Sequence, residues 1–465
     1  MIIMFPEKFI QRVEKQHYID SKALLRALEE PSPVSIRINK GKWNKVPAGT
    51  EPVPWCKTGF YLQSRPSFTL DPLFHSGCYY PGEASGMFLG QIFEQVDHQA
   101  DKLRILDLCG APGGKSTQLS DLAGPSGLLV ANETIRSRAA ILAETIAKWG
   151  AVNTIVTSND PAAFGKLKGF FDIILVDAPC SGEGMFRNRK AVEEWSAENA
   201  VLCAARQKRI ITDTWSSLKE SGILIYSTCT FNPDENEENI RWLIEKNEAE
   251  CIRLDVSAFE GITEIDHQGI YGYGFFPDKV MGEGFFIAVI RKTGIEHQEI
   301  VRIRKQNDLI PVKSDILVAT GWTGLPKERL LKRGDELIAL PCEIEEFIHI
   351  FSKLNIVRAG TSIAMVRSDD YLPSHDLALS QLLKKDAFPH KAAGYKEAIG
   401  YLRRDTIEQS DLQDGWNLLT YNNVNLGFVK NLGKRVNNYF PVELRIRMDL
   451  SLTGHENIIQ WKDES

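Results

Sequence analysis

The stretch RILDLCGAPGGKST, residues 104–117, limits most strongly what this chain can fold into. Residues 105–108, which are apolar or suited to a strand, predict a buried strand, the glycines and proline of residues 110–114 predict a tight turn, and Lys115 begins a predicted helix. A strand, a glycine turn and a helix in this order form the ligand-binding corner of a doubly wound α/β domain. Glycine lacks a side chain, so a ligand can approach the backbone of such a turn closely.

Three kinds of ligand suit a corner of this type, and the spacing argues against two of them. A Walker phosphate loop requires a glycine five residues before Gly114, and Cys109 stands there instead. The dinucleotide motif GxGxxG is also absent from the stretch. The third ligand is S-adenosylmethionine, whose methionine end packs on such a turn, although the turn alone does not decide the matter.

The chain from residue 101 onward alternates predicted strands and helices, which indicates a parallel sheet. A further strand pair near residues 275 and 285 predicts an antiparallel strand at the edge of that sheet. The expected strands are 104–108, 128–132, 153–157, 172–177, 222–228 and 284–291, and the expected helices are 114–122, 136–149, 190–220 and 235–248.

The 465 residues are too many for one hydrophobic core, so several domains are expected. Before the sheet, the pattern predicts a helical region, a strand, a turn and another helix, at residues 5–30, 34–39, 79–82 and 83–96. After it come strand-like stretches at 316–319, 336–340 and 361–366, then strands at 416–420 and 426–429 of a small β-barrel. We expect an N-terminal α+β module (1–100), a catalytic domain (101–293), a middle α+β domain (294–385, entered through 294–306) and a C-terminal domain (386–465).

Composition excludes several classes of protein. No apolar run approaches the roughly 20 residues of a membrane helix, and the first residues lack the pattern of a signal peptide, so a cytoplasmic location and no membrane partner are expected. The eight cysteines contain no CxxC pair, so no metal site is expected. The net charge of −6 argues against non-specific polyanion binding by the whole surface. A local basic stretch, which suits either a solvated face or a nucleic-acid contact, holds Lys430, Lys434, Arg435, Arg445 and Arg447 with one acid, Glu443.

Polar residues follow the second and third strands, where open α/β sheets place their ligands. Glu133 follows the second strand, and its carboxylate can accept hydrogen bonds from both ribose hydroxyls of a cofactor. Asp160 follows the third strand and can reach an adenine edge. Each residue has a structural alternative, because Glu133 also suits the start of a helix and Asp160 can cap the turn that begins at Pro161.

The fourth and fifth strands end in Asp177, Cys180 and Cys229, which adjacent parallel strands would bring to one rim. A single cysteine at a strand end is usually structural, but two beside an acid and a cofactor turn suit methylation at carbon 5 of a pyrimidine. A thiolate that adds to carbon 6 makes carbon 5 nucleophilic, and an acid at the N3/N4 edge stabilises the adduct. A free thiol has a pKa of about 8.5, so the site must lower it or supply a base. The pyrimidine must also leave its stack. These residues alone leave open which cysteine attacks.

The motifs PGEAS, LDLCGAPGGKS, VDAPCSGEG, AARQKRI, YSTCT and GFFIAVIRK resemble the bacterial RNA (cytosine-5)-methyltransferases of the Fmu/Sun family, most closely the RsmF type. The resemblance covers about residues 1–293, and the tail, with AIGYLRRDTI and LGFVKNLGKRVNNYFP, more weakly resembles the PUA-like ends of that subgroup. It implies a Rossmann-like, S-adenosyl-L-methionine-dependent methyltransferase core between a small N-terminal α+β module and a C-terminal PUA-like RNA-binding domain. One departure is Gly82, where the family commonly has glutamine, and it is expected to loosen a contact at the edge of the pocket.

The resemblance also implies roles for individual residues. Cys229, in the Thr-Cys motif, is implied to be the nucleophile, Cys180 to assist product release and Asp177 to contact the cytosine. Two cofactor candidates have plain alternatives, Arg138 as a solvated helix residue and Lys115 as a lysine at a helix start. The implied cofactor residues are Cys109, Gly110, Ala111, Pro112, Gly113, Gly114, Lys115, Glu133, Arg138, Asp160 and Asp177.

The expected activity is the formation of 5-methylcytosine in small-subunit (16S) ribosomal RNA by a monomeric enzyme through a Cys–C6 adduct. RNA contacts are expected from the basic tail, from the N-terminal module around Arg37, and from Arg187, Arg189 and Lys190. A non-catalytic RNA-binding factor in ribosome assembly is one alternative, but such a factor does not need both cysteines. A DNA cytosine-C5 methyltransferase is another, and the RNA-like N-terminal module and tail argue against it.

Overall fold

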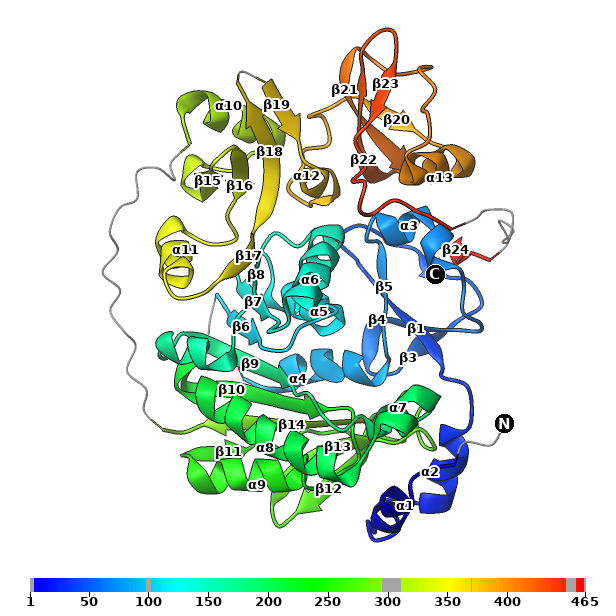
Figure 1. The fold of residues 1–465 in the computed structure, drawn as a ribbon, viewed down its shortest axis with the longest axis vertical. Helices are drawn as coiled ribbons and strands as arrows, with labels where there is room; N and C mark the ends of the chain where they lie inside the picture. The colour runs from blue at the N-terminus through cyan, green and yellow to red at the C-terminus, as the bar shows by residue number, and fades with distance from the viewer. Residues whose placement is uncertain (1–3, 98–101, 295–310, 369, 449–456, 464–465) are drawn as a thin grey trace.

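The protein is built around one ten-stranded mixed sheet (Figure 1). The computed structural model describes residues 4–97, 102–294, 311–368, 370–448 and 457–463. The strands of this sheet lie in the order β12-β13-β14-β10-β9-β6-β7-β8-β17, with β11 also paired to β14. Their bounds are β6 Arg104–Asp107, β7 Leu128–Asn132, β8 Thr154–Thr157, β9 Phe171–Asp177, β10 Leu218–Thr228, β11 Ala249–Cys251, β12 Thr263–His267, β13 Ile270–Phe275, β14 Phe285–Lys292 and β17 Ile356–Ala359.

The five central strands of the sheet, from β10 to β8, are parallel, whereas β14 pairs antiparallel with β10, and β13 pairs antiparallel with β14. This arrangement confirms the predicted doubly wound sheet with an antiparallel edge. The chain order reverses at β6, because β7 lies on one side of it and β9 on the other. Open α/β sheets bind ligands at the carboxyl ends of the strands beside such a reversal.

Helices cover both faces of the sheet because successive strand residues point to opposite sides. Leu106 of β6 belongs to a core with Ile210 and Leu243, on α8 and α9, whereas its neighbour Ile105 belongs to a core with Leu119 and Leu142, on α5 and α6. These four helices are α5 Gly114–Ala123, α6 Arg136–Trp149, α8 Ala197–Thr214 and α9 Glu237–Lys246.

The single helix expected at 190–220 is wrong, since the chain forms α7 (Arg189–Glu194) and then α8. Ser196 begins the second helix, because its Oγ accepts a hydrogen bond of 3.0 Å from the Asn199 N–H. After residue 217 the chain already enters β10.

The N-terminal module is a four-stranded sheet, β3-β4-β1-β5, preceded by two short helices. The helical region expected at 5–30 is two helices, and the turn expected at 79–82 is a strand whose Tyr79 lies opposite Ile38 of β1. The helix expected at 83–96 begins as a 3-10 turn, η2. The elements are α1 Glu7–Val13, α2 Ser21–Leu28, β1 Val34–Ile38, β2 Val46–Pro47, β3 Glu51–Val53, β4 Cys56–Leu62, η1 Phe68–Leu70, α3 Pro72–His75, β5 Tyr79–Pro81, η2 Ser85–Phe88 and α4 Leu89–Gln95.

The C-terminal third holds two further sheets, β15-β16-β18-β19 and β20-β21-β22-β23. In the described residues the second is an open four-stranded sheet rather than the expected barrel, and residues 316–319 lie in a helix, α10, rather than a strand. Most of the expected domain exit at 294–306 lies outside the described residues. The elements are α10 Lys313–Thr323, β15 Leu330–Arg333, β16 Glu336–Ala339, α11 Ile344–Phe351, β18 Thr361–Arg367, β19 Asp370–Pro373, α12 His375–Leu379, β20 His390–Ala392, α13 Tyr395–Arg403, β21 Gly415–Tyr421, β22 Val424–Asn431, β23 Val436–Asn438 and β24 Trp461–Lys462.

Two contacts between distant segments join these parts. β17 leaves the middle region and pairs antiparallel with β8, so that Ile356 lies opposite Thr157. The last strand, β24, returns to the N-terminal module and pairs with β2. Figure 1 shows β24 next to α3, near the C-terminus. Within the described ranges, no helix has the length and apolarity needed to cross a bilayer.

Candidate active site

A cavity of about 480 Å³ opens at the carboxyl ends of β6, β9 and β10. The glycine turn after β6 forms one side, and the loop after β5 forms another. Asp177, the last residue of β9, and Cys229, which follows β10, also line it. Its remaining walls include Tyr80, Met185 and Phe285.

The turn accepts no side chains at its glycines. A Cβ on Gly110 would lie 2.7 Å from Ser116 Oγ, and a Cβ on Gly114 would lie 2.9 Å from the ring of Tyr80. Gly113 has a φ of +117°, in the region that favours glycine. The backbone of the turn therefore forms the wall of the cavity directly.

Asp107 fixes the start of the helix behind this turn. Its Oδ2 accepts a hydrogen bond of 2.6 Å from Ser116 Oγ. Burial raises the pKa of the Asp107 carboxyl to about 7, although the bond from Ser116 opposes the rise. The residue thus ties the end of β6 to the first turn of α5.

Asp177 has both carboxylate oxygens held by neighbours. Lys115 Nζ lies 2.9 Å from Oδ2, and Ser227 Oγ donates to Oδ1 at 2.7 Å. Burial alone would lower the pKa of Lys115, but the Asp177 carboxylate outweighs it and the pKa is raised. An ion pair thus stands inside the cavity, with its acid at the end of β9.

The two predicted cysteines meet beside this ion pair. Cys180 Sγ and Cys229 Sγ are 2.9 Å apart, and the Cys229 N–H points to Cys180 Sγ at 3.3 Å. Both are free thiols. Contact with the Cys229 sulfur, together with burial, raises the pKa of Cys180 well above its ordinary value. Cys229 lines the cavity, and Cys180 is not among the lining residues.

Glu133 and Arg138 lie beside the turn rather than in the lining of the cavity. Arg138 Nη2 donates to the Ala111 carbonyl at 2.9 Å, and Nη1 lies 3.1 Å from Glu133 Oε2. Glu133 Oε1 accepts from the Ile135 N–H at 3.0 Å. The pair therefore links the end of β7 to the turn after β6.

Asp160, another predicted site residue, makes its contacts away from the glycine turn and the two cysteines. Its carboxylate accepts from the Ala162 N–H at 3.1 Å and pairs with Arg209 at 3.4 Å. Its side chain is 51% exposed and does not line the cavity. The observed geometry is the capping arrangement that the residue before Pro161 suggests.

Glu83 organises the cavity rim, and no role for it followed from the sequence. Its carboxylate accepts from the N–H groups of Ser85 at 2.8 Å, Gly86 at 2.9 Å and Glu283 at 2.9 Å. It thus joins the loop after β5 to the loop before β14. The quoted motif PGEAS was the available signal, because a carboxylate two residues before a helical turn often accepts from its N–H groups.

Two of the arginines expected to contact RNA are buried instead. Arg37 is 3% exposed and donates to Asp121 at 2.8 Å and Thr117 at 2.6 Å. Arg187 donates to the carbonyls of Gly282 and Ala27. These predictions were wrong because both side chains join the N-terminal module to the sheet domain. Arg189 and Lys190 are exposed, as expected. Among the described residues, no cluster of three His, Cys, Asp or Glu side chains is arranged to hold a metal.

Three family models match consecutive parts of the chain. One described as 16S rRNA methyltransferase RsmB/F matches residues 94–291. One described as the N-terminal domain of 16S rRNA methyltransferase RsmF matches residues 5–84. One described as the methyltransferase RsmF PUA domain matches residues 392–446. The core is therefore a Rossmann-like methyltransferase domain between an N-terminal module and a PUA domain, as predicted.

Relatives and solved structures agree with these matches. The ribosomal RNA small subunit methyltransferase F of Enterobacter sp. (strain 638) is 31% identical, with 98% of each chain covered. That of Klebsiella pneumoniae (strain 342) is also 31% identical, covering 95% of this chain and 97% of the relative. A methyltransferase homolog protein from Pyrococcus horikoshii is 26% identical with a TM-score of 0.50, covering 62% of this chain and 99% of its own. NSun6 from Pyrococcus horikoshii shares the fold at 20% identity and a TM-score of 0.52, covering 63% and 100%. The chain therefore belongs to the family of ribosomal RNA small subunit methyltransferase F.

Proposed function

We propose that this protein forms 5-methylcytosine in small-subunit ribosomal RNA, with S-adenosylmethionine as methyl donor and a transient bond between Cys229 and cytosine C6. Family membership supports methylation of this RNA class. The observation that carries the C5 chemistry is the sulfur pair, Cys180 and Cys229 at 2.9 Å, beside the Asp177–Lys115 ion pair.

The environment of the two sulfurs favours Cys229 as the nucleophile. Cys229 lines the cavity, where a flipped-out base can reach it. The pKa of Cys180 is raised by its contact with Cys229 and by burial, so Cys180 stays a thiol at neutral pH. Only a thiolate attacks effectively, so the sulfur that stays protonated is the poorer nucleophile.

The residues around the glycine turn suit the proposed cofactor. The turn offers bare backbone to its methionine end, because a side chain at Gly114 would press against Tyr80 in the cavity wall, and one at Gly110 would press against Ser116 behind the turn. The carboxylate of Glu133 suits the ribose hydroxyls, and those of Asp177, Glu83 and Glu283 favour a positive charge within the cavity. When bound there, S-adenosylmethionine supplies a methyl group on a positively charged sulfur.

In the proposed reaction the Cys229 thiolate forms a bond to C6, and the displaced π electrons make C5 nucleophilic. Asp177 accepts a hydrogen bond from the N4 amino group and, with Lys115, holds the N3/N4 edge. C5 gains the methyl group as the bond between that group and the donor's sulfonium sulfur breaks, with the electron pair left on the sulfur, and a base then removes the C5 proton. The electron pair of the C–H bond then restores the ring double bond, and the pair of the S–C6 bond returns to Cys229. Cys180, at the Cys229 sulfur, assists this departure.

The wild-type protein is expected to transfer label from methyl-labelled S-adenosylmethionine to 16S ribosomal RNA, and all of the label should be in 5-methylcytidine. Digestion to nucleosides followed by mass spectrometry makes this measurement. A matched reaction with duplex DNA should stay unlabelled. Label in another nucleoside would overturn the C5 assignment, and label in DNA would favour the DNA alternative.

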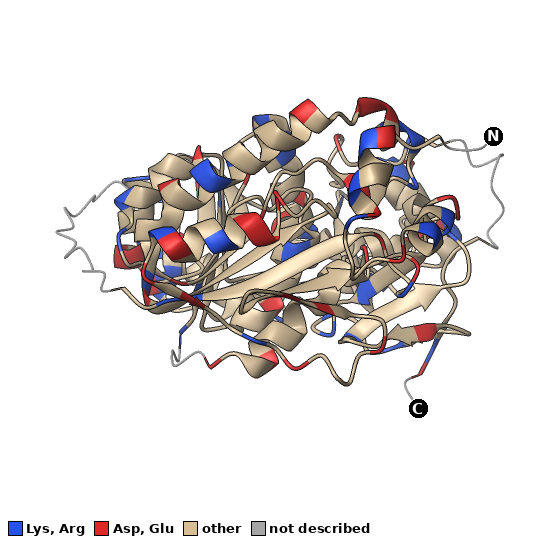
Figure 2. Cartoon of the chain, turned by 90° about the horizontal axis from the view of Figure 1, so that it is seen from below, with Lys and Arg blue, Asp and Glu red and all other residues tan. Residues whose placement is uncertain are grey.

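We propose that the exposed arginines and lysines of residues 434–447 supply RNA phosphate contacts. Lys434, Arg435, Arg445 and Arg447 are exposed, whereas Lys430 is half-buried over the ring of Trp416. Elsewhere, on the side seen in Figure 2, basic and acidic residues alternate along the helices instead of gathering by sign. Local contacts, rather than the field of the whole surface, should therefore supply RNA affinity.

Changing both Arg445 and Arg447 to glutamine should weaken RNA binding and flatten its salt dependence. Each lost phosphate contact with a single strand lowers the slope of log affinity against log salt by about 0.7, so the double variant should lose about 1.4. Titrations between about 50 and 200 mM salt measure the slope. Arg253→Gln, an exposed arginine of the sheet domain, is the control, and an equal effect in both variants would contradict the assignment.

A further inference from the structure

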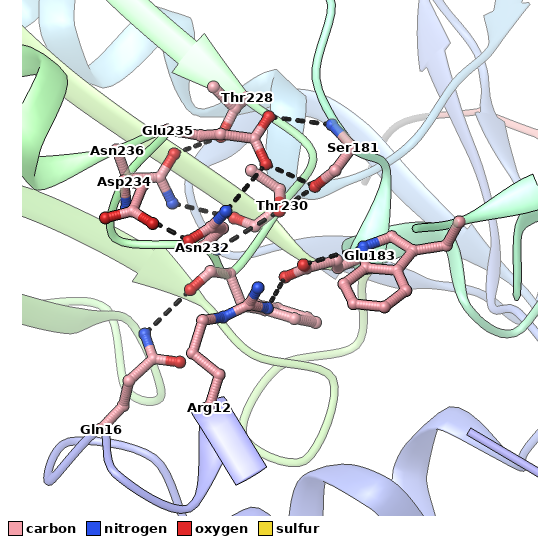
Figure 3. Close-up of polar contacts among 12 residues, drawn as sticks. Arg12, Gln16, Ser181, Glu183, Thr228, Thr230, Asn232, Asp234, Glu235 and Asn236 are labelled. Atoms are coloured by element: carbon pink, nitrogen blue, oxygen red, sulfur yellow. Dashed lines mark hydrogen bonds and ion pairs between the residues drawn. The ribbon is translucent and has the colours of Figure 1, made fainter. Parts of the chain in front are cut away.

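A buried carboxylate, Glu235, connects the loops that carry the two cysteines (Figure 3). Oε2 of Glu235 accepts a hydrogen bond of 2.9 Å from the Ser181 N–H, and Oε1 accepts one of 2.5 Å from Ser181 Oγ. Oε1 also lies 3.3 Å from Asn232 Nδ2. Ser181 directly follows Cys180, and Asn232 belongs to the loop after Cys229. One carboxylate therefore holds both loops.

Helix α8 adds a third connection to the same carboxylate. Gln207 Nε2 donates to Glu235 Oε2 and to the Pro179 carbonyl, both at 3.0 Å. Asn239 Nδ2 donates to Gln207 Oε1 at 2.7 Å, which orients the Gln207 amide. Pro179 directly precedes Cys180. The residues on both sides of Cys180 are therefore bound, directly or through Gln207, to Glu235.

Helix α1 and the segment directly after it, which holds Gln16, contact these two loops from outside, as Figure 3 also shows. Arg12 forms an ion pair with Glu183, which lies in the turn after Cys180. Gln16 Nε2 donates to the carbonyl of Phe231 at 2.8 Å. With α1 on one side and Glu235 on the other, the loops have little freedom to separate.

The two cysteines depend on this network to different degrees. Cys229 directly follows β10, whose pairing with β9 and β14 continues to Ser227 and Thr228. The sheet itself therefore fixes Cys229. Cys180 lies three residues beyond the end of β9, and its neighbours are held through Ser181 and Gln207. Loss of Glu235 should free Cys180 while Cys229 keeps its place.

We infer that Glu235 is a positioning residue that keeps Cys180 against the sulfur of Cys229. This inference rests on the proposed function, in which Cys180 acts only in product release. Its consequence is kinetic: without Glu235 the protein should still form the Cys229–C6 bond and methylate C5, but it should release its RNA slowly. The reaction should then stop largely at a covalent protein–RNA adduct.

The test compares Glu235→Ala with Glu235→Gln, with Cys180→Ala as the reference for blocked release. The amide of Glu235→Gln keeps one acceptor for Ser181 and should restore part of the steady-state rate. The control is Glu237→Ala, an equally buried carboxylate two residues along, which accepts from Tyr18 Oη at 3.0 Å rather than from the loops of the cysteines. Rapid-quench methyl transfer, steady-state rates and the adduct band on denaturing gels are measured for each protein.

For Glu235→Ala we expect a first turnover within about threefold of wild type, a steady-state rate at least tenfold lower, and an adduct band. Glu237→Ala should show no adduct. If the first turnover and the steady-state rate of Glu235→Ala fall together without an adduct, Glu235 is merely structural and the inference fails. If Cys180→Ala itself gives no adduct, the proposed function fails instead.

Discussion

Cys229→Ala is expected to abolish methyl transfer to RNA, with a loss of at least about 10⁴-fold, because a residue that forms the covalent bond has no substitute in the site. Without the thiolate, carbon 5 of the cytosine stays a poor nucleophile. The fold should survive, since the carbonyl of residue 229 still accepts from the Gly184 N–H at 2.9 Å and β10 keeps its pairs. The turn after β6, on the other side of the cavity, is unchanged, so cofactor affinity should also persist.

Single-turnover assays with labelled S-adenosylmethionine measure this loss, and calorimetry measures the cofactor affinity. Cys251→Ala is the matched control, because Cys251 is a free, half-buried thiol in β11 that donates a hydrogen bond to the Tyr271 carbonyl. Its activity should stay within a factor of about two. A substantial rate of methyl transfer in Cys229→Ala would contradict the proposed bond between Cys229 and the cytosine. Loss of activity in Cys180→Ala, with an adduct in Cys229→Ala, would instead reverse the roles of the two sulfurs.

The sequence predicted the central sheet well because residues close together in the chain determine each of its strands and turns. The strand, turn and helix at residues 104–117 each depend on neighbouring residues, and the parallel strands are short apolar runs. β17 was not predicted, since its four residues pair with β8 about 200 positions earlier. Residues 316–319 look strand-like by composition, but they lie in a helix whose first turn contains Asp315, which accepts from the Val312 N–H, and which ends at Gly324.

The candidate site was predictable to the extent that its residues follow strands. Asp177, Cys180 and Cys229 come together because parallel strands end at one edge, and the glycine turn lies beside them. The functions of Glu83 and Glu235 could not be deduced in this way, because their partners are N–H groups of loops distant in the sequence. The alternation of residues 34–39 places Arg37 on one face of its strand, but the pattern could not show that α5 covers this face.

Asp177→Asn is expected to lower the rate of methyl transfer by about 10² to 10³-fold, the range found when one preorganised polar group at a reacting centre is lost. The asparagine keeps the size of the side chain but removes the negative charge. Lys115, now beside a neutral amide, loses the partner that raises its pKa, so the ion pair that faces the cytosine edge is lost. The Ser227 hydroxyl also loses its carboxylate acceptor.

The control is Asp172→Asn at the opposite end of the same strand. Asp172 accepts from the Arg104 N–H at 2.8 Å and pairs with Lys219, so it loses similar interactions outside the cavity. A rate for Asp177→Asn within about threefold of this control would contradict a role in the reaction. Affinity for S-adenosylmethionine, measured by calorimetry in both variants, then separates two roles. If the affinity is unchanged and kcat falls, Asp177 contacts the cytosine. If the affinity falls in parallel with the rate, Asp177 contacts the cofactor. Each result follows because only the bound group that loses its contact with the carboxylate is destabilised.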